Sequence, residues 1–248
     1  MLQGLSLIDI IFVFSGAFII GLAKAGLRGI DMLNVTLMAL VFGGKLSTGI
    51  VLPLLCAGDI AAVIYYNRHA QWNHFWKLLP WMAIGIIIGV FWGKDMDELL
   101  FRKIMAVIIV ITVIIMLLME MRRSGAVPSH PLFAASTGIV AGITTMLGNL
   151  AGAFSNLYFL AMRVSKNNFI GTAAWLFLVI NLFKLPFQVI YWQNITTGTF
   201  KTDLFLLPAV AIGFILGVAI VKRIHEDQYR KVVVFLTLIG AAVIFLKN

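Results

Sequence analysis

Apolar residues recur along the whole chain in long runs, which polar or Gly/Pro-containing breaks separate. Ten such segments lie at 5–23, 32–42, 46–66, 75–93, 104–119, 132–147, 150–162, 169–192, 204–221 and 232–246. A helix of about 20 residues crosses a bilayer, and most of the segments approach that length. They do not alternate between polar and apolar positions as barrel strands do, so we predict transmembrane helices.

Composition supports a membrane protein and excludes other classes. Apolar residues make up 61% of the 248 positions and charged residues 12%. Soluble domains contain about 25% charged residues, so this chain has too little polar surface for a water-soluble globule. Disordered chains are poor in apolar residues, which excludes that class as well. The single cysteine, Cys56, excludes an internal disulfide framework and a cysteine-rich metal site. We therefore predict an all-α, polytopic membrane bundle.

The two halves of the sequence share a pattern. The letters LLP at 78–80 precede AIG at 83–85, and LLP at 206–208 precedes AIG at 211–213, with the same spacing in both halves. An Arg-Lys pair follows each proline at the same distance, at 102–103 and 230–231. Five segments precede a polar break at 122–125 and five follow it. We predict one membrane domain of two repeats, 1–124 and 125–248, which are inverted because each has an odd number of segments.

The charges in the loops predict the orientation of the chain. If all ten segments cross the membrane, one face receives twelve Lys and Arg residues and the other receives six. Because positive residues gather in cytoplasmic loops, we predict that both termini lie outside the cell. The second and seventh segments, 32–42 and 150–162, are short. A re-entrant hairpin at each of these positions would leave the orientation unchanged.

Interrupted segments at matching places in two halves are the best sequence indicator of a transporter site. Here glycine-containing breaks lie at 21–29 and 144–152. A short helix starting after each break would present free N–H groups and a positive dipole end to an anion. We predict an anion site formed by residues around both breaks: Lys24, Gly26, Arg28, Thr144, Thr145, Gly148 and Asn149. Alternatively, the glycines only permit close helix packing, and Lys24 and Arg28 lie in an ordinary cytoplasmic loop.

Ionisable residues inside apolar segments are costly and usually functional. Asp59 lies deep in the third segment, and Asn181 lies at the equivalent depth of the second half. Asn181, Lys184 and Gln188 follow helical spacing, so they form one polar stripe that faces the bundle interior. We predict that Asn181 and Lys184 contact the anion and that Asp59 couples transport to a proton or another ion. A structural Asp59–Lys184 ion pair is the alternative.

Several stretches of the chain resemble the TauE/SafE family of sulfite exporters. They are GLAKAGLRG (21–29), LPLLCAGDI (52–60), YYNRHA (65–70), KNNFIGTAAW (166–175) and NLFKLP (181–186). The resemblance covers essentially the whole chain. It implies a carrier in the bacterial inner membrane that exports sulfite, thiosulfate, sulfonates or related anions. Members commonly have a Gly-Gly-Gly-rich break, which Arg28 and Asp31 interrupt here.

Two other classes of function compete with a carrier that works by alternating access. An anion channel would share the fold, and saturable, coupled flux would distinguish the carrier from it. An intramembrane enzyme is disfavoured because Asp59 has no second embedded acid opposite it. The four histidines lie in loops or near segment ends, so we expect no metal site and no other cofactor. The expected partners are a small anion and membrane lipid, without nucleic acid, and the sequence leaves a homodimer open.

Overall fold

A computed structural model describes residues 4–101, 103, 104, 107, 110, 111, 114 and 130–247 of the chain. Nine of the ten predicted segments are helices in this part of the chain. The helices are α1 (Leu7–Lys24), α2 (Asp31–Phe42), α3 (Gly44–Tyr66), α4 (Trp72–Lys94), α6 (Pro131–Gly148), α7 (Ala151–Ala161), α8 (Lys166–Pro186), α9 (Thr197–Arg223) and α10 (Glu226–Lys247). Most of the fifth segment, 104–119, and the boundary between the repeats at 124/125 lie outside the described residues.

Helix length separates membrane-crossing helices from short ones. Among the described residues, six helices are long and apolar enough to cross a membrane, namely α1, α3, α4, α6, α8 and α9. By contrast, α2 has 12 residues and α7 has 11. At 1.5 Å per residue these helices are about 18 Å long, shorter than the roughly 30 Å hydrocarbon core. The protein is therefore a multi-pass membrane protein in which each short helix follows a long one without crossing by itself.

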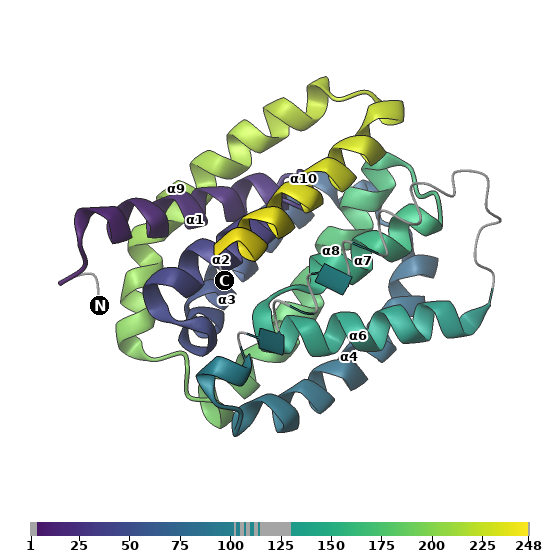
Figure 1. Cartoon of the computed structure of the whole chain (residues 1–248). Helices are drawn as coiled ribbons and strands as arrows, with labels where there is room; N and C mark the ends of the chain where they lie inside the picture. Colours follow the sequence, from purple (N-terminus) through teal and green to yellow (C-terminus); the bar gives the residue numbers. More distant parts are fainter. Residues whose placement is uncertain are drawn as a thin grey trace.

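Two close helix crossings join the early and late parts of the chain. Figure 1 shows α1 beside α9 and α4 beside α6, and both pairs are in extensive contact. Gly21 and Gly213 face each other's helix across the first crossing, and a Cβ added to either glycine would overlap a backbone carbonyl of the partner helix. Gly85 and Gly142 make the same arrangement in the second crossing. Small residues thus let both helix pairs approach at backbone distance.

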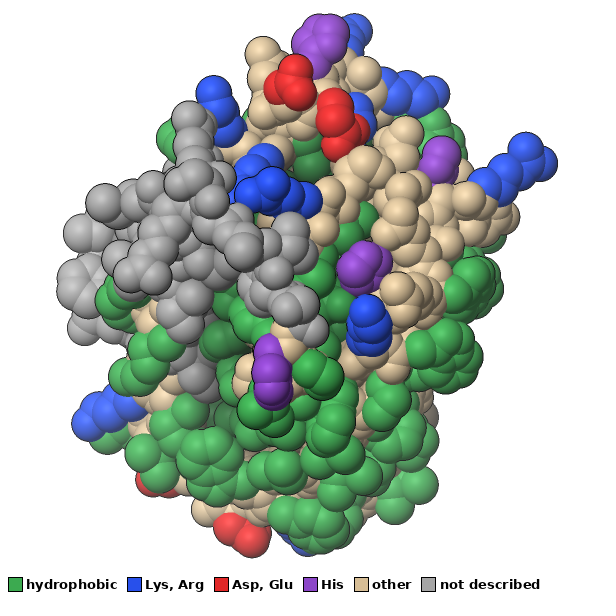
Figure 2. All heavy atoms as spheres, turned by 90° about the vertical axis from the view of Figure 1, so that its right-hand side faces the viewer, with side chains coloured by type: hydrophobic (Ala, Val, Ile, Leu, Met, Phe, Trp, Pro, Cys, Tyr) green, Lys and Arg blue, Asp and Glu red, His purple; other side chains and the backbone are tan. Residues whose placement is uncertain are grey.

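The centre and the periphery of the bundle differ in polarity. The helices α3 and α8 pack against each other in the interior, and their buried residues include several that are polar: Thr48, Asp59, Thr172, Asn181 and Lys184. Large apolar side chains such as Ile64, Phe91 and Ile215 are exposed on the outside. Figure 2 shows hydrophobic side chains over the lower half of one face, with charged side chains mostly toward its upper end. This distribution fits a lipid-facing surface around a polar interior.

Candidate functional site

Both predicted breaks are helix ends in the structure. The first long helix ends at Lys24, and Gly26 turns the backbone with φ +118°. In the second half α6 ends at Gly148, and Asn149 adopts the left-handed conformation with φ 57°. Glycine and asparagine are the residues that most readily terminate a helix in this way. Each break then leads directly into a short helix, α2 or α7, as the glycine pattern predicts.

A small polar cavity lies between the two breaks. Its volume is about 30 Å³, and it is lined by parts of α1, α2, α3, α6, α7 and α8 together with the two breaks. Its polar lining includes five of the ten predicted site residues and two that were not predicted. These residues are Lys24, Arg28, Asp31, Asn34, Thr145, Asn149 and Asn181. The fold therefore brings together residues from both halves of the chain, as the paired breaks indicated.

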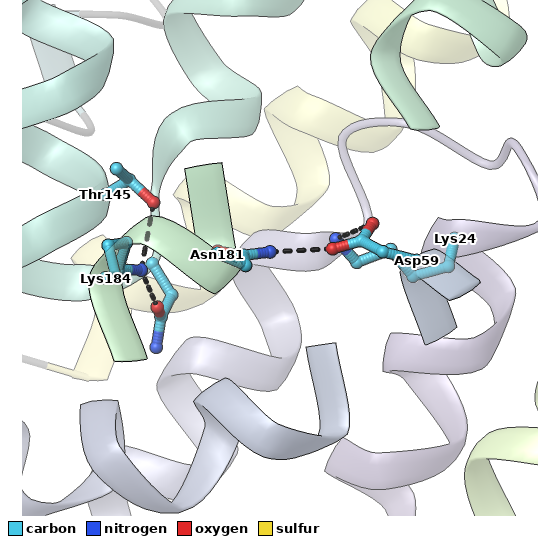
Figure 3. A network of polar contacts seen from close by, with 6 residues as sticks. Lys24, Asp59, Thr145, Asn181 and Lys184 are labelled. Atoms are coloured by element: carbon cyan, nitrogen blue, oxygen red, sulfur yellow. Dashed lines mark hydrogen bonds and ion pairs between the residues drawn. The ribbon is translucent and has the colours of Figure 1, made fainter. Parts of the chain in front are cut away.

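One end of the cavity holds an ion pair. Lys24 Nζ lies 2.6 Å from Asp59 Oδ1, and Asn181 Nδ2 donates to Asp59 Oδ2 at 2.7 Å. Lys24 is 6% exposed and Asp59 is completely buried. Figure 3 shows Asn181 between this pair and Lys184. Two alternatives are therefore wrong: Lys24 is not in an ordinary exposed loop, and the ionic partner of Asp59 is Lys24 rather than Lys184.

Lys184 lies behind two lining residues, Thr145 and Asn149, and has only neutral partners. Its Nζ donates to Asn149 Oδ1 at 2.6 Å and to Thr145 Oγ1 at 3.2 Å. Asn149 in turn donates from Nδ2 to the carbonyl oxygen of Thr48 at 3.0 Å, which fixes the amide orientation. Lys184 is fully buried, and no carboxylate pairs with it within the described part of the chain. An ammonium group without a counter-charge makes this end of the site attractive to an anion.

Arg28 adds buried hydrogen-bond donors to the cavity. It is 4% exposed, and its Nε and Nη2 have no hydrogen-bond partner among the described residues. Its guanidinium carbon lies 5.1 Å from the centre of the Phe177 ring, and Lys24 Nζ lies 5.0 Å from the same ring. The ring orients both cations without satisfying their N–H groups. Buried donors without partners are costly, so a ligand that accepts from Arg28 is favoured.

Five of the predicted residues are not among those that line the cavity. Asp59 and Lys184 hydrogen-bond to lining residues, and the other three shape the breaks. Gly26 packs against Ile170 and Val221 of the neighbouring helices, where a Cβ would overlap the Ile170 side chain. The hydroxyl of Thr144 donates to the carbonyl of Ala141 in its own helix at 3.1 Å. Gly148 is the last residue of α6. None of the three is among the lining residues.

Sequence reasoning did not place Asp31, Asn34 or Phe177 in the site. Asn34 is buried, and its Oδ1 has no partner in the described residues. Asp31 and Asn34 stand three residues apart at the start of a short helix, and this spacing after a glycine-rich break was an available signal. No sequence signal distinguishes Phe177 from other apolar residues of its helix, because only the folded bundle brings its ring to the two cations.

The comparison with known proteins agrees with these observations. Residues 13–244 match the family described as "Sulfite exporter TauE/SafE". The chain belongs to the TauE/SafE family. Comparisons with curated proteins and with solved structures gave no match. Membership in TauE/SafE confirms the family expected from the sequence stretches above. Together with six membrane-length helices it identifies a multi-pass membrane protein of a transporter family.

Proposed function

We propose that this TauE/SafE protein transports small oxyanions of sulfur, such as sulfite, through the cavity between the two breaks. The observation that carries the proposal is Arg28, a buried guanidinium whose Nε and Nη2 have no partner in the described part of the chain. Lys184 supports it as a second buried cation without a carboxylate. The starts of α2 and α7 add positively polarised N–H groups near the cavity.

Alternating access is the mechanism we propose for this site. The lining residues come from both halves of the chain, so movement of one half against the other would open the cavity to each side in turn. The matching glycine crossings, α1 with α9 and α4 with α6, support an inverted repeat of residues 1–124 and 125–248. A channel is less well supported, because the cationic side chains that would bind an anion are buried rather than arranged along an open pore.

We propose that Asp59 couples transport to protons. An anion that draws Lys24 away removes the only ionic partner that Asp59 has among the described residues. A buried carboxylate without a partner favours its neutral form, so anion binding and proton uptake by Asp59 would be linked. The charge distribution of the loops supports termini outside the cell, and the family supports export across the bacterial inner membrane.

Flux into liposomes that contain the purified protein tests the function. Sulfite uptake should saturate with concentration, and Arg28→Gln should reduce it about tenfold or more, because a hydrogen bond to a charged group is worth about 1.5–3 kcal/mol. Arg223→Gln is the matched control, because this exposed arginine ends α9 away from the cavity. Flux that rises linearly with concentration would indicate a channel. Equal flux in Arg28→Gln and the control would refute the site.

The same liposomes test the coupling role. Imposing a pH gradient should drive sulfite flux in the unmodified protein, whereas Asp59→Asn should retain exchange of anions but not respond to the gradient. A gradient response that persists in Asp59→Asn would contradict the role of this carboxylate.

A further inference from the structure

A carboxylate of the protein occupies the place where an incoming anion is expected. Asp31 is the first residue of α2 and lines the cavity. Its Oδ1 accepts a hydrogen bond from the backbone N–H of Gly29 at 2.9 Å. Its Oδ2 lies against Gly152 in the first turn of α7, so closely that a Cβ on Gly152 would overlap the carboxylate. The side chain thus lies between the starts of the two short helices.

This carboxylate does not neutralise the cation that shares the cavity with it. Within the described residues Arg28 forms no ion pair with Asp31, and two of its nitrogen atoms remain without partners. An anion that accepts from Arg28 would therefore lie in the same small cavity as a negative charge that the protein itself supplies. The two negative charges would repel each other at this short range.

The size of the cavity keeps an incoming anion close to Asp31. Its volume of about 30 Å³ corresponds to room for roughly two water molecules. An anion that accepts from Arg28 in so small a space therefore lies beside the Asp31 carboxylate.

The formal charges define which anion is accepted. The Lys24–Asp59 pair is neutral as a unit. Among the lining residues Arg28 is the one further cation and Asp31 the one further anion. Lys184 adds a positive charge behind the lining, where it donates to Asn149 and Thr145. We infer that the negative charge of Asp31 restricts the site to small anions with a single negative charge. This inference rests on the proposed function, because it describes the selectivity of the same site.

Two anions of different charge test the inference in liposomes. Methanesulfonate carries one negative charge and thiosulfate carries two at neutral pH. The unmodified protein should transport methanesulfonate faster than thiosulfate at equal concentration. Asp31→Asn keeps an oxygen that can accept from Gly29 but removes the charge, so it should raise the ratio of thiosulfate to methanesulfonate flux about tenfold, equivalent to about 1.4 kcal/mol. Asp31→Glu, which keeps the charge, should leave thiosulfate disfavoured.

Controls separate this inference from the proposed function. Asp227→Asn removes an exposed carboxylate at the start of α10 and should leave the flux ratio unchanged. An unchanged ratio in Asp31→Asn, with saturable flux intact, would overturn the inference and leave transport standing. Absence of saturable flux for every anion in the unmodified protein would overturn both.

A binding measurement covers the case in which Asp31→Asn does not fold. At matched ionic strength, methanesulfonate should raise the melting temperature of the unmodified protein in detergent more than thiosulfate does. Equal or greater stabilisation by thiosulfate would overturn the inference.

Discussion

The two buried lysines of the polar network have different kinds of partner. At one end Lys24 is paired with Asp59, and at the other Lys184 is held by the neutral oxygens of Asn149 and Thr145. Asp59 of α3 and Asn181 of α8 hydrogen-bond to each other (Figure 3). A single difference, an acid in one half and an amide in the other, therefore leaves one lysine compensated and the other without a counter-charge.

This difference predicts that the two lysines contribute differently to stability. Removing one partner of a buried ion pair is strongly destabilising, because the other charge remains buried. A buried cation without a counter-ion is already costly, and removing it relieves that cost. We therefore expect the loss of Lys24 to reduce stability more than the loss of Lys184.

The largest expected effect is the loss of the ion pair. Lys24→Met leaves the fully buried Asp59 without its cation, so the free energy of unfolding should fall by about 3–5 kcal/mol. Chemical denaturation in detergent measures this change. The double variant Lys24→Met/Asp59→Asn removes both charges and should recover most of the loss. If the double variant is as unstable as the single one, the ion pair is not the reason for the loss.

The second-largest expected effect is the loss of Lys184. Lys184→Met should reduce saturable sulfite flux about tenfold to a hundredfold, because a charged donor to the anion is lost, while the free energy of unfolding stays the same or rises. Flux in liposomes and denaturation in detergent provide the two readouts. Lys222→Met, at an exposed position near the end of α9, is the control. If Lys184→Met lowers the free energy of unfolding more than Lys24→Met does, Lys184 and not Lys24 is the lysine that stabilises the fold.

The glycine crossings allow a comparison of the two halves outside the network. Gly21→Ala and Gly142→Ala each place a Cβ against a backbone carbonyl of the partner helix, so each should reduce the free energy of unfolding by about 1–3 kcal/mol. Gly198→Ala is the matched control, because the nearest atom to its added Cβ is 3.6 Å away. Thermal unfolding of the three variants measures the difference. A loss at only one crossing would show that the two halves are packed differently.

The smallest expected effect lies at the starts of α1 and α6. Ser6 Oγ accepts from the N–H of Asp9 at 3.2 Å, and Asp9 accepts in return. At α6, His130 Nδ1 accepts from Leu132 N–H at 3.2 Å, and Pro131 needs no partner for its nitrogen. Ser6→Ala should cost about 1 kcal/mol, and His130→Ala should cost less. Thermal unfolding checks the order, and a greater loss in His130→Ala would contradict it.

Much of the fold and part of the site were predictable from local sequence. The apolar segments identified nine described helices, and the glycine-containing breaks marked the ends of α1 and α6. Helical spacing predicted that Asn181, Lys184 and Gln188 face inward, and all three are buried. The partner of Asp59 was not predictable in this way, because spacing along one helix gives no information about which residue lies on its neighbour.

The sequence alone determined that this chain crosses a membrane as helices, where the helices break, and that Asp59 and Lys184 must be buried. These properties depend on the cost of exposing backbone or charge to lipid, which acts on each segment separately. Only the tertiary structure decided that Asp59 binds Lys24, that Lys184 is left with neutral partners, and that Asp31 lies beside Gly152. Those contacts join residues far apart in the chain, and their geometry is fixed by the packing of helices against one another.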